Sequence, residues 1–269
     1  MPFKELKFCY NWRSYQEKFL SHFQSHIHDN HLHVIAPPGS GKTILGLEIM
    51  RRLNKKTLIL SPTLTIRNQW HEILQSFFSN NTNFDKYSFD INEPKEVIFS
   101  TYQSLHSFFK KCKSKEDYFE YFEKNNIAVL ILDEAHHLKN EWWKCLYELK
   151  EHHKQTIVAL TATPPYDSDA LEVTKYFKLC GDIDDEISIP DLIKEGDLCP
   201  HQDYVYFSKP TDVEINFITD FRLKVASFFD SLEFDSELIG VIENHRFVKK
   251  APLFIWVPQY LDAENKVIK

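Results

Sequence analysis

The chain has 269 residues, of which 43% are hydrophobic and 26% are charged, as in ordinary soluble globular proteins. The formal net charge of −7 argues against a protein that coats nucleic acid through a global positive field, although local cations and backbone amides can still hold one strand. No stretch reaches the roughly 18 uncharged apolar residues of a membrane helix, and the amino terminus lacks a signal-peptide pattern. We therefore expect a cytoplasmic protein without a membrane partner.

Strand-like and helix-like segments alternate as far as Pro165. An amphipathic helix is predicted first, at Tyr15–Phe23. The predicted strands are short, apolar and bounded by polar residues: Leu32–Ala36, Thr57–Leu60, Val97–Ser100, Ile127–Leu132 and Thr156–Leu160. The helices predicted between them are Lys42–Leu53, Thr65–Phe78 and Trp142–Lys150. This alternation predicts an α/β fold with a mostly parallel sheet and helices on both faces, whose ligands bind at the carboxyl ends of the strands.

The segment after Pro165 is mainly helical. Its predicted elements are helices at Asp167–Leu179 and Ile187–Gly196, a strand at Tyr204–Phe207 and a long helix at Glu214–Leu232. We therefore expect one α/β domain at residues 1–207. A partial accessory or linker segment, a mainly helical extension, is expected at residues 208–269.

The cysteines and histidines do not form a familiar framework. The five cysteines are scattered and include no C-x-x-C pair, which indicates reduced thiols. His22 and His26 are one helical turn apart and His28, His31 and His33 follow, but no other residue completes a common ligand spacing. A metal site is conceivable here, and we expect surface histidines instead.

A phosphate-binding loop follows the strand at Leu32–Ala36. Residues 36–43 read APPGSGKT, which matches the pattern G-x-x-x-x-G-K-[ST] except that alanine replaces the first glycine. The residues predicted to contact ATP are Pro38, Gly39, Ser40, Gly41, Lys42 and Thr43. Lys42 would reach the terminal phosphates, and Thr43 would coordinate Mg²⁺. A chance glycine-rich turn is the alternative, but the chain has only six glycines and the flanking strand and helix fit the loop.

An acidic box, DEAH, ends the strand at Ile127–Leu132. We assign Asp133 to Mg²⁺ and Glu134 to polarising the attacking water, so that these two carboxylates and Lys42 form the catalytic set. Lys42 and Asp133 are expected at the tips of neighbouring strands. His136 would sense the phosphate site or link it to a nucleic-acid site. A helix-start cluster without metal is the alternative, and the nearby phosphate loop disfavours it.

The ordered motifs resemble the first RecA-like domain of DEAD/DEAH-box-type superfamily 2 helicases and translocases. APPGSGKT resembles motif I, LILDEAHHLKN (130–140) motif II, ALTATPP (159–165) motif III, SPTLTIRNQW (61–70) motif Ia and FSTYQSL (99–105) motif Ib. The resemblance covers about residues 10–165 and implies a RecA-like P-loop NTPase fold, ATP hydrolysis, and ATP and Mg²⁺ as cofactors. It also implies nucleic acid as a partner; we expect DNA, although the residues themselves do not separate DNA from RNA.

The same resemblance assigns further site residues. Arg13 and Gln16 belong to an element of the form R-x-Y-Q whose glutamine recognises adenine, so both are expected to bind ATP. Thr161 and Thr163 would couple the ATP state to domain movement. The nucleic-acid face would include Thr63, Arg67, Ser100, Thr101 and Gln103. The alternatives are a surface glutamine, threonines that simply end a strand, and ordinary loop polars. The lysines between Lys110 and Lys115 favour a solvated loop or helix face.

A complete motor of this family closes a second RecA-like domain over ATP and supplies arginines from a motif Q-x-x-G-R-x-x-R. Nothing in residues 166–269 resembles that motif, so we expect slow hydrolysis by this chain and completion by a second domain or a partner subunit. Residues 191–200 resemble the exit from the first domain in restriction-enzyme-like members, or they form a surface helix and turn.

Two functions fit these motifs. The first is an ATP-binding motor that couples hydrolysis to nucleic-acid binding, translocation or unwinding. The second is a nucleotide-dependent recognition or regulatory subunit of a defence or restriction complex. A P-loop NTPase of signalling or kinase type would leave the DEAH box and the TAT sequence unexplained.

Overall fold

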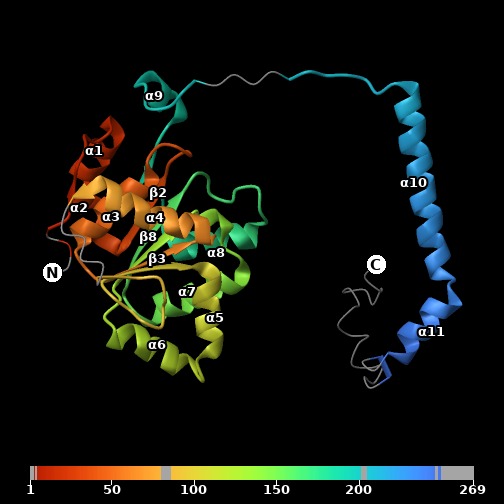
Figure 1. Cartoon of the computed structure of the whole chain (residues 1–269), viewed down its shortest axis with the longest axis horizontal. Helices are drawn as coiled ribbons and strands as arrows, with labels where there is room; N and C mark the ends of the chain where they lie inside the picture. The colour runs from red at the N-terminus through yellow and green to blue at the C-terminus, as the bar shows by residue number, and fades with distance from the viewer. Residues whose placement is uncertain (1–2, 4, 80–85, 201–204, 246–247, 250–269) are drawn as a thin grey trace. The chain divides into compact units, whose positions relative to one another are not determined.

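The computed structural model describes residues 3, 5–79, 86–200, 205–245 and 248–249 (Figure 1). The chain divides into two compact units, Met1–His201 and Gln202–Lys269. The first unit contains the sheet, and the second contains long helices.

A seven-stranded sheet forms the centre of the first unit, and all its neighbouring strands are parallel, in the order β5-β6-β3-β7-β8-β2-β9. The strands are β2 (His31–Ile35), β3 (Thr57–Ser61), β5 (Tyr87–Ser88), β6 (Val97–Thr101), β7 (Val129–Asp133), β8 (Thr156–Thr161) and β9 (Asp185–Glu186). Among the five strands of five or more residues, β3, β6, β7 and β8 are buried along their whole length, which is why they read as continuous apolar segments. Parallel pairing brings their carboxyl ends to one edge.

The five predicted strands all form, close to their predicted bounds. The prediction of neighbouring strand tips is wrong, because β8 lies between β2, which precedes the phosphate loop, and β7, which ends in Asp133. Strand order depends on how the crossovers are arranged, which local patterns do not encode. The additional pair of β1 (Lys7–Phe8) with β4 (Phe78–Ser79) is too short to show a periodicity.

Helices of the first unit cover both faces of the sheet. They are α1 (Ser14–Ser21), α2 (Phe23–His26), α3 (Lys42–Leu53), α4 (Leu64–Phe77), α5 (Tyr102–Lys111), α6 (Lys115–Lys124), α7 (Asn140–His152), α8 (Ala170–Cys180) and α9 (Ile189–Lys194). Helix α3 has its predicted bounds, and the predicted helix at Tyr15–Phe23 divides into α1 and α2. Helices α5 and α6 were not predicted, although Thr101 and Ser114 are regular N-caps that accept hydrogen bonds from backbone amides.

Two apolar layers separate the faces. On one face, α1 to α4 pack against alternate strand residues such as Ile131 and Leu160. On the other face, α5 to α8 pack against the residues between them, such as Leu130 and Leu132. In Figure 1, α1 to α4 lie in the upper part of the first unit, and α5, α6 and α7 lie in its lower part. The strand pleat therefore explains why both faces are apolar.

The histidine cluster is not wholly at the surface. His33 on β2 is fully buried, with Nε2 2.8 Å from the Tyr176 hydroxyl and Nδ1 3.1 Å from the Gly181 carbonyl. The prediction of surface histidines is therefore wrong for His33, because β2 is covered on both faces and all its residues after His31 are buried. Among the described residues, no group of three or more histidines, cysteines, aspartates or glutamates is placed to hold a metal ion.

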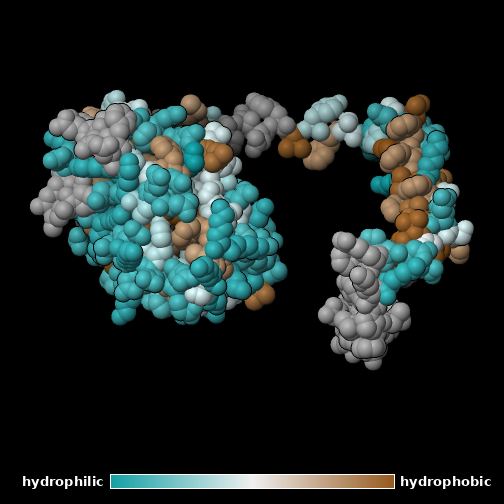
Figure 2. All heavy atoms as spheres, turned by 60° about the horizontal axis from the view of Figure 1, so that its bottom comes forward, coloured by the Kyte–Doolittle hydropathy of each residue, from teal (hydrophilic) through white to brown (hydrophobic). Residues whose placement is uncertain are grey.

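The second unit contains α10 (Asp212–Glu233) and α11 (Ser236–Asn244). A capping box starts α10: the Thr211 hydroxyl accepts from the Glu214 amide, and the Glu214 carboxylate accepts from the Thr211 amide at 2.7 Å. Figure 2 shows apolar side chains along α10, where Phe217 and Phe221 are exposed. No helix in the described part of the chain combines the length and apolarity needed to cross a bilayer.

The strand predicted at Tyr204–Phe207 is not observed. Val205 to Phe207 have no regular secondary structure and are exposed, and Tyr204 lies outside the described residues. A strand requires a hydrogen-bonded neighbour, and none of the described strands pairs with this segment.

Gly46 offers a test of packing between α3, α4 and the sheet. A Cβ atom at Gly46 would lie 2.5 Å from the Trp70 ring and 2.7 Å from Leu160, so Gly46→Ala should destabilise the first unit by roughly 1–3 kcal/mol through overpacking. Helix propensity alone predicts a gain of about 1 kcal/mol. Thermal unfolding measures the difference. The control is Gly240→Ala in α11, where no described atom lies within 4 Å of the new methyl group; a stabilised Gly46→Ala variant would contradict the packing.

Candidate functional site

The loop between β2 and α3 has the backbone of a phosphate-binding loop. Gly39 and Gly41 have φ angles of 78° and 102°, in the left-handed region that favours glycine. A Cβ atom at Gly41 would lie 2.8 Å from Nε2 of Gln16. Because α3 begins at Lys42, the first amides of the helix have no carbonyl partner within it and can bind an anion.

The R-x-Y-Q element forms hydrogen bonds to the backbone carbonyls of this loop. Arg13 donates to the carbonyls of Gly39 at 2.8 Å and Ser40 at 2.5 Å, and the Tyr15 hydroxyl donates to Ser40 at 2.8 Å. Gln16 donates to the Gly41 carbonyl at 3.3 Å. In a trans peptide, the carbonyl and the N–H of the next residue point in opposite directions. Because the loop carbonyls point toward α1, the N–H groups that follow them point to the opposite side. Arg13 and Gln16 thus preorganise the loop.

Gln16 is only 2% exposed, so the alternative of a surface glutamine is wrong. Its side-chain carbonyl accepts from the Arg13 amide at 3.1 Å while its amide group faces the loop. A contact between Gln16 and adenine stays a prediction.

Lys42 and the acidic box meet in one cleft although their strands are not neighbours. The Lys42 ammonium donates to the Ala36 carbonyl at 2.9 Å and lies 3.3 Å from Oε1 of Glu134. The cleft has a volume of about 490 Å³. Its lining includes the loop glycines, Lys42, Thr43, Asp133 and Glu134. The predicted catalytic set is therefore brought together at the carboxyl edge of the sheet.

Asp133 is a buried carboxylate, 4% exposed, at the end of β7. Burial raises its pKa to about 6, an effect that the hydrogen bond from the Trp70 indole opposes and the nearby Glu134 charge reinforces. The Trp70 nitrogen lies 2.6 Å from Oδ2 of Asp133, and the Tyr102 hydroxyl lies 2.8 Å from the backbone oxygen of Asp133. A divalent cation would favour the charged form of this carboxylate.

Glu134 has a backbone conformation that is rare for residues with a Cβ atom. Its φ of 48° and ψ of 51° lie in the left-handed region, where strain at functional sites is common. Its Oε2 is enclosed and accepts no hydrogen bond, with Nδ1 of His136 at 3.4 Å. An unpaired carboxylate oxygen here suits a group that orients water. The oxygens of Thr43 and Asp133 on the same cleft are the hard ligands that Mg²⁺ prefers, so the residues fit that ion.

The three residues predicted to couple motions are connected. Nδ1 of His136 lies 2.7 Å from the Thr161 hydroxyl, which donates to the Thr163 carbonyl at 3.0 Å. Because the hydroxyl has one hydrogen, His136 must donate through Nδ1. Burial lowers the pKa of His136, which favours the neutral ring. A chain of hydrogen bonds therefore runs from the acidic box to the loop after β8.

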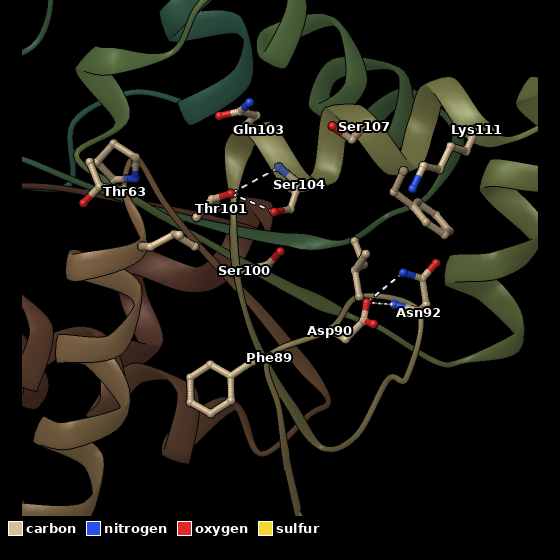
Figure 3. Close-up of a pocket in the computed structure, with 14 residues that line it drawn as sticks. Thr63, Phe89, Asp90, Asn92, Ser100, Thr101, Gln103, Ser104, Ser107 and Lys111 are labelled. Atoms are coloured by element: carbon tan, nitrogen blue, oxygen red, sulfur yellow. Dashed lines mark hydrogen bonds between the residues drawn. The ribbon is translucent and has the colours of Figure 1, made fainter.

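A second cavity of about 630 Å³ contains four of the five predicted nucleic-acid residues (Figure 3). They are Thr63, Ser100, Thr101 and Gln103. We call this cavity the groove. Thr63 caps the start of α4 and Thr101 caps the start of α5, so the amino-terminal ends of two helices open on the groove. Arg67 is not part of the lining; its guanidinium lies 5.0 Å from the ring centre of Phe89.

The other wall of the groove was not predicted. Phe89, Asp90 and Asn92 contribute to it, and Phe89 is 41% exposed. Figure 3 also shows Ser104, Ser107 and Lys111, which follow Thr101 at helical spacing. That spacing would have identified them if α5 had been predicted. Among the clustered lysines, Lys111 lines the groove, whereas Lys115 forms an exposed ion pair with Glu148 at 2.7 Å.

A parallel sheet that carries a phosphate loop and an acidic box on one edge defines a P-loop NTPase domain. Residues 9–166 match the family model described as "Type III restriction enzyme, res subunit", and the chain belongs to this family. The predicted recognition, a first RecA-like domain of the superfamily 2 helicase type that resembles restriction enzymes, is confirmed. The predicted α/β fold with a helical extension is confirmed as well.

Similar proteins include helicases and a translocase. The chain is 28% identical over 131 residues to "DNA 3'-5' helicase XPB" of Mycobacterium tuberculosis, covering 48% of this chain and 23% of that protein. It is 26% identical over 175 residues to "DNA 3'-5' translocase XPB2" of Sulfurisphaera tokodaii, covering 64% and 35%. The Hef helicase domain of Pyrococcus furiosus superposes with a TM-score of 0.49 at 20% identity, covering 68% and 39%. The chain thus spans well under half the length of the relatives it matches.

Asp133→Asn should stabilise the nucleotide-free chain while removing its carboxylate. The folded-state pKa of Asp133, about 6, exceeds the ordinary 3.8, so the fold favours the protonated form. Stability should fall as pH rises from about 4 to 6, and the loss should persist at neutral pH. The variant should gain roughly 1–3 kcal/mol in unfolding free energy at pH 7.5. Denaturant unfolding measures this, with the exposed Asp90→Asn as the control that gains nothing; a destabilised Asp133→Asn variant would contradict the account.

Proposed function

We propose that the chain is the ATP-binding motor domain of a helicase-like protein, coupling ATP hydrolysis to binding and movement on DNA. The observation that carries this proposal is the meeting of Lys42 and Glu134, 3.3 Å apart, in a cleft beside the phosphate loop. The groove, lined by the predicted nucleic-acid residues, adds a second site.

The cleft residues divide the chemistry of ATP hydrolysis among them. The loop amides and the Lys42 ammonium bind the phosphates and balance their charge. Glu134 orients the attacking water and accepts its proton at the carboxylate. The Thr43 hydroxyl and Asp133 would hold Mg²⁺, which would neutralise negative charge on the phosphates. Arg13 and Gln16 keep the loop in shape, and Gln16 contributes adenine recognition.

His136, Thr161 and Thr163 transmit the state of the cleft. The hydrogen bonds from His136 to Thr161 and from Thr161 to Thr163 begin two residues after Glu134 and end beyond β8. A change in the Glu134 environment therefore reaches the loop after β8. We propose that a second RecA-like domain or a partner subunit responds there and supplies the arginines that complete the motor, so hydrolysis by this chain is slow.

DNA is the proposed partner of the groove. The two relatives described above are named as a DNA helicase and a DNA translocase. The starts of α4 and α5 offer unpaired amides to phosphate oxygens, and hydroxyls of Ser100 and Ser104 lie beside them. A purely regulatory function is not favoured, because it does not explain why Lys42 and Glu134 lie together beside the phosphate loop.

Lys42→Ala should lower ATP turnover by roughly 10²–10⁴-fold through loss of phosphate stabilisation. Glu134→Gln should lower turnover similarly but retain nucleotide binding, because the amide still fills the site and cannot accept the proton. Steady-state phosphate release and binding of a fluorescent ATP analogue separate the two effects. Lys144→Ala, an exposed lysine on α7, is the control. ATP turnover by Lys42→Ala at the rate of the unmodified chain would contradict the proposal.

Lys111→Ala should weaken DNA binding several-fold and reduce the salt dependence of the affinity. Loss of one phosphate contact lowers the slope of log affinity against log salt by about 0.9 for duplex DNA. Fluorescence anisotropy across a NaCl series measures both quantities. Lys113→Ala changes charge equally, but Lys113 is not among the residues that line the groove. Equal effects of both substitutions would show that the groove is not the DNA site.

A further inference from the structure

Asp133 is held from both faces of the sheet. On one face, α4 supplies Trp70, whose indole N–H donates to Oδ2 of Asp133 at 2.6 Å. On the other face, α5 supplies Tyr102, whose hydroxyl donates to the backbone oxygen of Asp133 at 2.8 Å. Both donors are fully buried. The carboxylate and its peptide are thus fixed by two separate helices.

These two helices are the ones that begin at the groove. Thr63 caps α4, and Trp70 lies seven residues further along the chain, about two helical turns away. Thr101 caps α5, and Tyr102 is the first residue of that helix. Each helix therefore has one end at the groove and a hydrogen-bond donor at Asp133. A shift of either helix on nucleic-acid binding would move its donor.

The packing around Trp70 leaves little room to absorb such a shift. Its ring lies where a side chain on Gly46 would clash, against α3, which follows the phosphate loop. Leu160 of β8 lies at the same point. Closely packed interiors transmit displacement rather than absorb it.

We propose that Trp70 and Tyr102 are positioning residues that couple the groove to the ATP cleft by holding Asp133 from opposite faces of the sheet. Nucleic acid bound at the starts of α4 and α5 changes how the two donors hold Asp133, and nucleotide bound at Asp133 changes the groove by the same free energy. The inference rests on the proposed function and adds a route distinct from the His136–Thr161 bond.

A core-filling role is the competing explanation, and it makes a different prediction. If Trp70 and Tyr102 only fill space, removing their polar hydrogens lowers stability and leaves the coupling intact. Trp70→Phe and Tyr102→Phe remove the donors and keep an aromatic ring. The chain offers matched controls in Trp143, whose indole donates to the Lys175 carbonyl at 2.6 Å, and Tyr118, whose hydroxyl donates to the Cys145 carbonyl at 3.3 Å. Trp143→Phe and Tyr118→Phe remove equivalent donors away from Asp133.

The experiment measures the affinity of the whole chain for a fluorescent DNA duplex, with and without a saturating non-hydrolysable ATP analogue and Mg²⁺. The ratio of the two affinities is the coupling factor, expected to be about fivefold or more in the unmodified chain. Trp70→Phe and Tyr102→Phe should bring the ratio toward one while changing nucleotide-free DNA affinity less than twofold. The two controls should keep the original ratio.

Two results would overturn the inference, and they have different meanings. If the unmodified chain binds both ligands with coupling and both donor variants keep it, Trp70 and Tyr102 only fill the core and the proposed function stands. If the unmodified chain binds no DNA or no nucleotide, the proposed function fails as well. Circular dichroism checks folding of each variant. Should Trp70→Phe unfold, Tyr102→Phe decides the outcome, because it removes a single hydroxyl.

Discussion

The burial of a carboxylate at the end of β7 is the constraint on which the site depends. Asp133 is charged only at a cost inside the protein, and the cost is offset by a short hydrogen bond from Trp70 and by the nearby Lys42 ammonium. Each compensating group comes from a different helix, so α3 and α4 must pack closely beside the sheet. Gly46 permits that approach, because any larger side chain would meet the Trp70 ring. The buried carboxylate of Asp133 thus requires α3 and α4 to pack closely together on one face of the sheet.

The parallel sheet converts distant motifs into neighbours. The loop after β2, the acidic box after β7 and the threonines after β8 all lie at carboxyl ends of strands, and therefore at one edge. The starts of α4 and α5 follow β3 and β6 at that same edge and open on the groove. The carboxyl ends of the parallel strands therefore place the cleft and the groove at one edge of the same compact unit. Coupling between them requires only small movements of helices that are already in contact with both.

Much of this arrangement could be predicted from the residues, and the failures have physical causes. Continuous apolar segments identified the five long strands, because a strand that is buried on both faces has apolar residues at successive positions. The loop at Lys42 and the pair Asp133-Glu134 were found because their chemistry demands particular residues at particular spacing. Strand order was missed, since β8 separates β2 from β7 and no local pattern records crossovers. Helix α5 was missed as well, and with it Tyr102 and Lys111, because FSTYQSL at its start was interpreted as a motif of the nucleic-acid face and no helix was predicted there.

The central claim is that ATP hydrolysis in the cleft responds to DNA in the groove. The most direct test measures ATP turnover by the chain while duplex DNA is added, beside a direct measurement of DNA binding in the same buffer. The account predicts that turnover rises with DNA, that half-maximal stimulation occurs at the dissociation constant, and that added salt shifts both together. Turnover that stays constant while DNA saturates the chain would contradict it.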